Sequence, residues 1–125
     1  MSSFDLLIVG AGPAGLSLAA RLSGAPIRIA IIDKEDKSIL CAPPYDGREI
    51  ALTRRSIERL RTLDAWQNLA SEEVSPLVRA EVLDGRSPYV LAFADRQARS
   101  ALGALVANAA IRRTLFERVA NQDNC

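Results

Sequence analysis

Three glycines near the N-terminus have the spacing of a turn that binds phosphate. Gly10, Gly12 and Gly15 follow the apolar residues 6–9. The first glycine permits a tight turn, the second lets the backbone approach a pyrophosphate, and the third lets the next helix pack closely on the strand. The pyrophosphate would bind free N–H groups at the positive dipole end of that helix. The predicted binding turn comprises Gly10, Ala11, Gly12, Pro13, Ala14 and Gly15.

A dinucleotide site of this kind also needs an acid about 20 residues further on, at the end of a second strand. Residues 27–32 supply the strand and Asp33 supplies the acid, and we include the adjacent Lys34 in the predicted site. The alternative is an ordinary strand-turn-helix with incidental glycines. The acid at the expected distance favours the dinucleotide site. The spacing alone does not distinguish FAD from NAD.

Hydrophobic periodicity predicts the elements that position these residues. Residues 6–9 form an unbroken apolar run, which is typical of a parallel strand buried on both faces. Pro13 suits the first turn of a helix that reaches residue 22 and has an apolar side for packing on a sheet. Residues 27–32 predict a second parallel strand, and residues 34–45 predict a loop. The fold class is therefore α/β, with a parallel sheet at its core.

The periodicity changes in the middle of the chain. Residues 50–66 predict one helix with Thr53 as a candidate N-cap. The four arginines of this segment are interpreted mainly as a solvated face. Residues 77–83 and 89–93 flank a turn signal. They predict an antiparallel pair, an excursion from the parallel core.

The C-terminal part predicts a strand followed by a long helix. Residues 95–100 are interpreted as a polar connection, and residues 102–107 as a strand. Asn108 is a candidate N-cap for a helix over residues 109–120, whose apolar residues recur on one side. Residues 121–125 show no pattern.

Composition excludes several classes of function. The chain has 125 residues, enough for one domain, and 16 basic against 15 acidic residues, so there is no electrostatic case for binding nucleic acid. There is no histidine, which excludes Ser-His-Asp and Cys-His catalysis and most zinc sites. We therefore predict no metal site, and we assign no catalytic residue to this chain. Cys41 and Cys125 are interpreted as free thiols in a reducing cytoplasm, where any contact with the inner membrane would be peripheral.

Three stretches resemble a known family, in that family's order. DLLIVGAGPAGLSLAARL, with IIDK after it, resembles the FAD-binding N-terminus of glutathione-reductase-like flavoproteins. DGREIALTRRSIERLRTLDAW, residues 46–66, is similar to a segment of the flavin-dependent ring hydroxylases of ubiquinone biosynthesis, the polyprenylphenol hydroxylases. ALVANAAIRRTLFERV, residues 104–119, is similar to the segment of those enzymes that opens a helix with a flavin-contacting arginine. The resemblance implies a Rossmann-like FAD-binding domain that is incomplete at this length.

The resemblance also implies roles for individual residues. It assigns the glycine turn to the pyrophosphate of FAD and Asp33 to the adenosine ribose. It assigns Arg48 and Arg112 to the phosphate and ribityl region, where a guanidinium forms paired hydrogen bonds with phosphate oxygens. The alternatives are a surface charge for Arg48 and a solvated helix face for Arg112. Of Arg112 and Arg113, we expect Arg113 rather than Arg112 to point to solvent.

Two residues depart from the family's pattern. Ala107 stands where the family often has a side chain able to hydrogen-bond near the flavin. Asp64 stands where glycine is usual, so we expect a less comfortable helix end there.

The resemblance implies an activity for a longer protein. Residues 1–125 would be the N-terminal part of an FAD-binding domain, without the substrate domain and the later FAD motifs. The whole protein would use NAD(P)H and oxygen to hydroxylate a polyprenylated phenol, a quinone precursor held by the absent domain. The 125-residue chain would be inactive and would self-associate through an exposed sheet edge and apolar faces. Peripheral membrane or biosynthetic-complex association is expected only of the whole protein. The alternatives are another FAD-dependent oxidoreductase, such as a dehydrogenase, and a non-catalytic dinucleotide-binding module.

Overall fold

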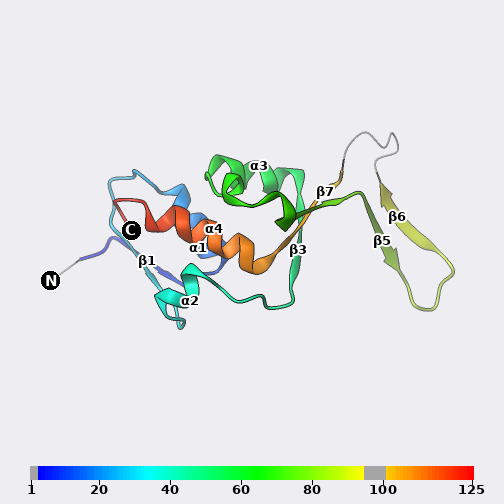
Figure 1. Cartoon of the computed structure of the whole chain (residues 1–125), viewed down its shortest axis with the longest axis horizontal. Coiled ribbons are helices and arrows are strands. Elements are labelled where there is room, and N and C mark those ends of the chain that lie inside the picture. Colours follow the sequence, from blue (N-terminus) through cyan, green and yellow to red (C-terminus); the bar gives the residue numbers. More distant parts are fainter. Residues whose placement is uncertain (1–2, 95–100) are drawn as a thin grey trace.

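A computed structural model describes residues 3–94 and 101–125. Its strands form a parallel pair β1–β2, an antiparallel sheet in the order β3–β7–β4, and an antiparallel ribbon β5–β6 (Figure 1). The elements are β1 (Leu6–Val9), α1 (Pro13–Arg21), β2 (Ile29–Ile32), α2 (Lys37–Cys41), β3 (Glu49–Thr53), α3 (Arg54–Thr62), the 3-10 helices η1 (Trp66–Asn68) and η2 (Ser71–Glu73), β4 (Val74–Leu77), β5 (Arg79–Leu83), β6 (Val90–Ala94), β7 (Gly103–Ala107) and α4 (Asn108–Ala120).

The strand-turn-helix-strand at the N-terminus confirms the sequence prediction. β1 and β2 are parallel, with Leu6 opposite Ile29, and α1 begins at Pro13. The prediction that both faces of β1 are buried is wrong. Ile8 is 7% exposed, but its neighbour Val9 is 82% exposed. Successive side chains of a strand point to opposite faces, and the core of the described residues covers only the face that Ile8 enters.

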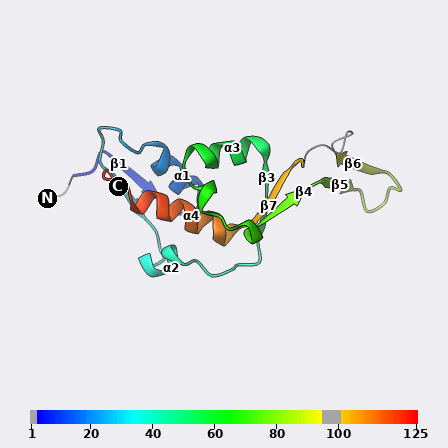
Figure 2. The same ribbon diagram turned by 45° about the horizontal axis from the view of Figure 1, so that its top comes forward.

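One core joins the parallel pair to the antiparallel sheet. Its most deeply buried large apolar side chains come from α1, β2, β7 and α4, and they are Leu16, Ile29, Val106 and Leu115. α4 packs along α1, where Ala19 is fully buried and allows a close approach. In Figure 2, α1 and α4 lie side by side between β1 and β3. The packing of these two helices therefore fixes the parallel pair relative to the other sheet.

The helix predicted over residues 50–66 is wrong at its start. Glu49–Thr53 forms β3, with Ile50 opposite Val106 and Leu52 opposite Ala104. The alternation of half-buried and exposed side chains in β3 is a strand pattern, and pairing with a strand far along the chain decides it. A Cβ at Gly103 would lie 1.9 Å from the carbonyl oxygen of Leu52, so β7 needs glycine at this position, where it pairs with β3.

Both ends of α3 follow local capping rules. Thr53 is the N-cap as predicted, since its Oγ1 accepts a hydrogen bond from the backbone N–H of Ser56 at 3.2 Å. At the other end, the N–H of Ala65 donates to the carbonyl of Leu60 and the N–H of Asp64 donates to that of Arg61. This is a Schellman motif, and it puts Asp64 at a φ of +57°. An aspartate thus occupies a left-handed position that favours glycine.

Three other sequence predictions need correction. Residues 34–45 are not all loop, because α2 forms there and Leu40 packs against the core. The strand predicted over residues 77–83 is divided into β4 and β5 at Val78. Asn108 is the first residue of α4 rather than its N-cap, which is Ala107. The antiparallel pair β5–β6 is confirmed, and the connection predicted at 95–100 lies outside the described residues.

The last residues are anchored, although their sequence shows no pattern. The side-chain amide of Asn124 donates to the carbonyls of Leu22, Ala25 and Ile27 at 2.9–3.3 Å. The backbone N–H of Ile29 donates to the carbonyl of Asn124 at 2.8 Å. The segment after α4 thus closes the connection between α1 and β2.

In the described part of the chain, no helix has both the length and the apolar character needed to cross a bilayer.

Candidate functional site

The glycine turn has the geometry of an open anion cradle. Gly10 has a φ of +105°, a conformation that side chains other than glycine rarely adopt. A Cβ at Gly15 would lie 2.1 Å from the carbonyl oxygen of Gly10, so the helix can approach the strand only with glycine there. A Cβ at Gly12 would meet nothing within 4 Å. Gly12 is also the N-cap of α1 without a capping side chain, which leaves the first N–H groups of α1 for a ligand. The turn therefore fits a pyrophosphate.

The structure brings Asp33 onto this turn. Its Oδ2 accepts a hydrogen bond from the backbone N–H of Ala11 at 2.6 Å, and its Oδ1 accepts one from that of Glu35 at 2.9 Å. These two hydrogen bonds, with the positive charge of Arg112, lower the pKa of Asp33 below its ordinary value. Each carboxylate oxygen keeps a second lone pair, so the ionised side chain can still accept from a ribose hydroxyl. Lys34 points outward, with its side chain 88% exposed and its Nζ 3.8 Å from Glu35.

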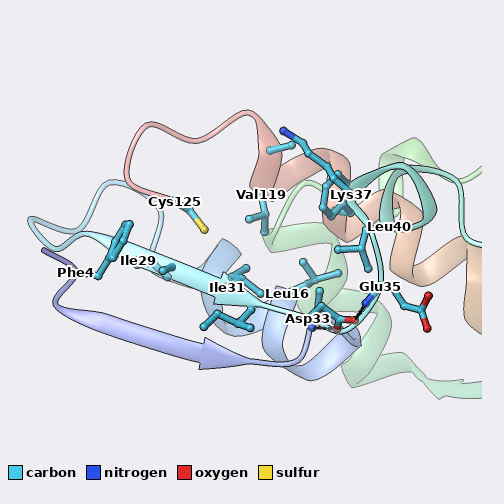
Figure 3. Close-up of a pocket in the computed structure, with 15 residues that line it drawn as sticks. Phe4, Leu16, Ile29, Ile31, Asp33, Glu35, Lys37, Leu40, Val119 and Cys125 are labelled. Atoms are coloured by element: carbon cyan, nitrogen blue, oxygen red, sulfur yellow. Dashed lines mark hydrogen bonds between the residues drawn. The ribbon is translucent and has the colours of Figure 1, made fainter. Parts of the chain in front are cut away.

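A cavity of about 570 Å³ opens on the Asp33 side of the turn. β2 forms one wall, and α2 and the end of α4 form the other. Figure 3 shows Asp33 at one end of this cavity and Phe4 at the other, with Ile31 and Ile29 along the strand between them. Ala11 also lines it, so the cavity begins at the glycine turn.

A second cavity, of about 960 Å³, borders the other side of the turn. Pro13 and Ala14 line it where α1 begins, and Ile50 of β3 and Asn108 of α4 line it further away. The six-residue turn therefore lies between two cavities. This arrangement can hold the middle of a long ligand whose two halves extend in different directions.

Arg48 belongs to a cluster that sequence reasoning found only in part. The carboxylate of Asp46 accepts hydrogen bonds from Arg48 Nε at 2.9 Å and from Asn108 Nδ2 at 2.8 Å. These contacts lower the pKa of Asp46 strongly and raise that of Arg48. Arg48 is therefore an ion-paired residue, with a side chain that is still two-thirds exposed. Asp46 stands two positions before Arg48, and that spacing was the available signal. Nothing in the sequence linked either residue to Asn108.

The neighbouring Arg112 and Arg113 of α4 differ in their surroundings. Arg112 is half-buried, and its positive charge acts on Asp33. Its contact with the phosphate and ribityl region of FAD stays a prediction. The expectation that Arg113 points to solvent was wrong. Its Nη2 lies 2.8 Å from Glu73 and its Nη1 lies 3.3 Å from Glu117. Arg113 therefore connects α4 to the segment before β4.

The chemistry of these residues is that of binding. Within residues 3–94 and 101–125, no group of three acids or cysteines is placed to hold a metal ion. Cys41 and Cys125 are free thiols, and burial raises the pKa of Cys125.

Solved structures share this fold at low sequence identity. A myxobacterial FAD-dependent halogenase, the chondrochloren halogenase CndH, matches 96% of this chain with 27% of its own, at a TM-score of 0.71 and 18% identity. A flavoprotein/dehydrogenase from Cytophaga hutchinsonii matches 94% of this chain with 28% of its own, at a TM-score of 0.66 and 21% identity. The expected Rossmann-like fold is confirmed.

The relatives similar in sequence include two ubiquinone hydroxylases. Ubiquinone hydroxylase UbiM of Neisseria meningitidis is 45% identical over 96% of this chain and 27% of its own. Ubiquinone hydroxylase UbiL of Rhodospirillum rubrum is 35% identical over 92% of this chain and 27% of its own. The chain thus spans about a quarter of the length of these relatives.

The predicted cofactor is confirmed by the family to which the sequence belongs. The FAD binding domain family matches residues 3–121, a range that includes the glycine turn, Asp33, Arg48 and Arg112. With the open turn, the fixed acid and the two adjoining cavities, this match leads to one conclusion: the chain is a member of the FAD binding domain family.

Proposed function

We propose that this chain binds the ADP half of FAD within a flavin-dependent monooxygenase. The whole protein would hydroxylate a polyprenylated phenol, a quinone precursor, with NAD(P)H and oxygen. The observation that carries the proposal is the glycine turn, open at Gly12 and held by Asp33 through Ala11. The similarity to two ubiquinone hydroxylases supports the choice of substrate class. Bound FAD would supply the transfer of electrons from NAD(P)H to oxygen.

The residues of this chain would bind and orient the cofactor. The N–H groups at the start of α1 would hold the pyrophosphate, and Asp33 would accept from the adenosine ribose. Arg48 and Arg112 would face the phosphate and ribityl region, and Lys34 would lie at the exposed rim. We propose no catalytic residue in this chain. Both cavities are open, so the 125-residue chain would bind FAD with a Kd weaker than micromolar and would not oxidise NADPH.

Titration of FAD and of ADP into the purified chain tests the proposal. Gly12→Asp places a carboxylate in the open cradle without a clash and should weaken both ligands at least tenfold, by bulk and by charge repulsion. Gly85→Asp adds the same charge in the distant β5–β6 turn, where a Cβ also meets nothing, and should leave both Kd values unchanged. Equal affinities for Gly12→Asp and the unsubstituted chain would exclude this binding mode.

The activity of the whole protein has a separate test. NADPH oxidation that produces a hydroxylated phenol would support the monooxygenase. Oxidation without oxygen insertion would favour the second candidate, a dehydrogenase, which the fold shared with a flavoprotein/dehydrogenase supports. We propose the cytoplasm as its location. Contact with the inner membrane would be peripheral, or would occur through a biosynthetic complex, and sedimentation with membranes in low and high salt would detect it.

A further inference from the structure

We propose that Asp46 is a positioning residue that holds Arg48 and Asn108 as one unit against the flavin half of the cofactor. This inference rests on the proposed binding of FAD. Asp46 precedes β3 and Asn108 begins α4, 62 residues later, so one carboxylate connects the two elements. Nothing in the resemblance or in the comparisons assigns a role to Asp46.

The contacts fix Arg48 at both its side chain and its backbone. Asp46 Oδ2 accepts from Arg48 Nε and Nη2, and Asp46 Oδ1 accepts from the backbone N–H of Arg48 at 3.1 Å. The carbonyl of Arg48 in turn accepts from the backbone N–H of Asn108 at 2.9 Å. An exposed arginine without such partners would occupy many rotamers, and ordering it on binding would cost entropy. Asp46 lowers that cost in advance.

The same contacts set the orientation of Asn108. Its side-chain amide donates to Asp46 at 2.8 Å, and the residue is 5% exposed. The amide oxygen of Asn108 is an acceptor, and Arg48 Nη1 is a further donor; neither takes part in the hydrogen bonds to Asp46. The unit thus offers a ligand one acceptor and one cationic donor at defined positions.

The position of the unit indicates which half of FAD it would contact. Asn108 lines the larger cavity together with Pro13 and Ala14, whereas Asp33 lines the smaller cavity together with Ala11. If Asp33 marks the adenosine half, the Asp46 unit lies on the opposite side of the pyrophosphate turn. It would therefore act on the ribityl and flavin half, which ADP lacks.

A comparison of FAD with ADP distinguishes positioning from a structural role. Asp46→Asn keeps the shape of the side chain. It replaces a carboxylate that accepts from three side-chain N–H groups with an uncharged amide, which cannot form the ion pair with Arg48. We expect its Kd for FAD to rise about tenfold, the loss of one charge-assisted hydrogen bond, while its Kd for ADP stays within twofold. Glu73→Gln is the matched control, because Glu73 pairs with Arg113, a residue of α4 that lines neither cavity, whereas Asp46 pairs with Asn108, which lines the larger one. It should leave the ratio of the two Kd values unchanged.

A double-mutant cycle measures whether Asp46 acts on FAD binding through Arg48, and this readout does not depend on the stability of the variants. Arg48→Lys keeps the charge and loses the planar fork, so adding Asp46→Asn to it should change FAD binding less than twofold further. Equal weakening of FAD and ADP by Asp46→Asn, or no weakening of either, would overturn the positioning role while FAD binding itself stands. An unsubstituted chain that binds neither ligand would overturn the proposed function, and this inference with it.

Discussion

The carboxylate of Asp33 accepts a 2.6 Å hydrogen bond from the backbone N–H of Ala11, 22 residues earlier in the chain. The acid that is expected at the ribose thus also holds the turn expected at the pyrophosphate. One side chain therefore serves both the predicted ribose site and the glycine turn. The integrity of the turn should therefore depend on the ionisation of Asp33.

We expect the chain to lose stability in acid. Hydrogen bonds lower the folded-state pKa values of Asp33 and Asp46 below the ordinary 3.8, and that of Glu73 below 4.5. A lowered pKa contributes stability above the unfolded value, and this contribution is lost as the pH falls through the folded value. The midpoint of urea unfolding should therefore be steady from pH 7 to 5 and decrease below about pH 4. For Asp46→Asn the decrease should be shallower, and parallel curves for the two proteins would contradict the assignment.

Gly15 should be the least replaceable glycine of the turn for stability. Gly15→Ala would force its Cβ to within 2.1 Å of the Gly10 carbonyl oxygen, so α1 must shift away from β1. Overpacking of this kind costs about 1–3 kcal/mol, measured as the free energy of unfolding in urea. Gly12→Ala is the control, because its Cβ has open space and its φ of −79° is ordinary. Equal stabilities for the two variants would show that the helix does not depend on this close contact.

Asp64→Gly should stabilise the chain. The residue has a φ of +57° at the end of α3, where a side chain strains the backbone and glycine does not. The expected gain is about 0.5–1 kcal/mol in the free energy of unfolding. Asp64→Ala keeps a Cβ and should show no gain, which separates relief of strain from removal of the charge. A loss of stability on introducing glycine would mean that the aspartate makes a favourable contact of its own.

The β5–β6 ribbon should promote self-association of the chain. Figures 1 and 2 show it projecting from the end of the molecule opposite both termini. Val82 and Leu91 lie opposite each other, next to the pair Ala80 and Phe93, and form an apolar face. Val82, Leu91 and Phe93 are 48–58% exposed. Light scattering should give a mass that increases with concentration.

A charge placed on each face of the ribbon tests this expectation. Leu91→Lys should reduce the association, because it interrupts the apolar face. Ala92→Lys adds the same charge to the other face of β6 and should not. A chain that remains monomeric at all concentrations would count against an exposed apolar face as a driving force.

The sequence patterns correctly predicted those structural features that depend on interactions between residues close together in the chain. The turn from Gly10 to Gly15 and the Thr53 cap depend on residues within one helical turn of each other, so their patterns were sufficient. β3 was misread because its partner is β7, whose paired residues lie 50 to 58 positions further along the chain. Asp46 was missed for the same reason, since its importance comes from Asn108. Arg113 occupies a position in α4 that the sequence does not distinguish from a solvent-exposed one. Only the folded structure brings Glu73 within hydrogen-bonding distance of it.

The hydrogen bonds of Asn124 also bear on the order of events during synthesis. The unit from β1 to β2 is synthesised before Asn124. The Asn124 amide, which donates to the carbonyls of Leu22 and Ile27, follows these residues by 102 and 97 positions. Until then those carbonyls must bind water, and the backbone of Ile29 lacks the acceptor that Asn124 provides. Contacts between such distant residues form late and slow folding. The β1–β2 unit, although synthesised before Asn124, is therefore among the last parts of the described chain to be completed, and until then its apolar strands are exposed to aggregation.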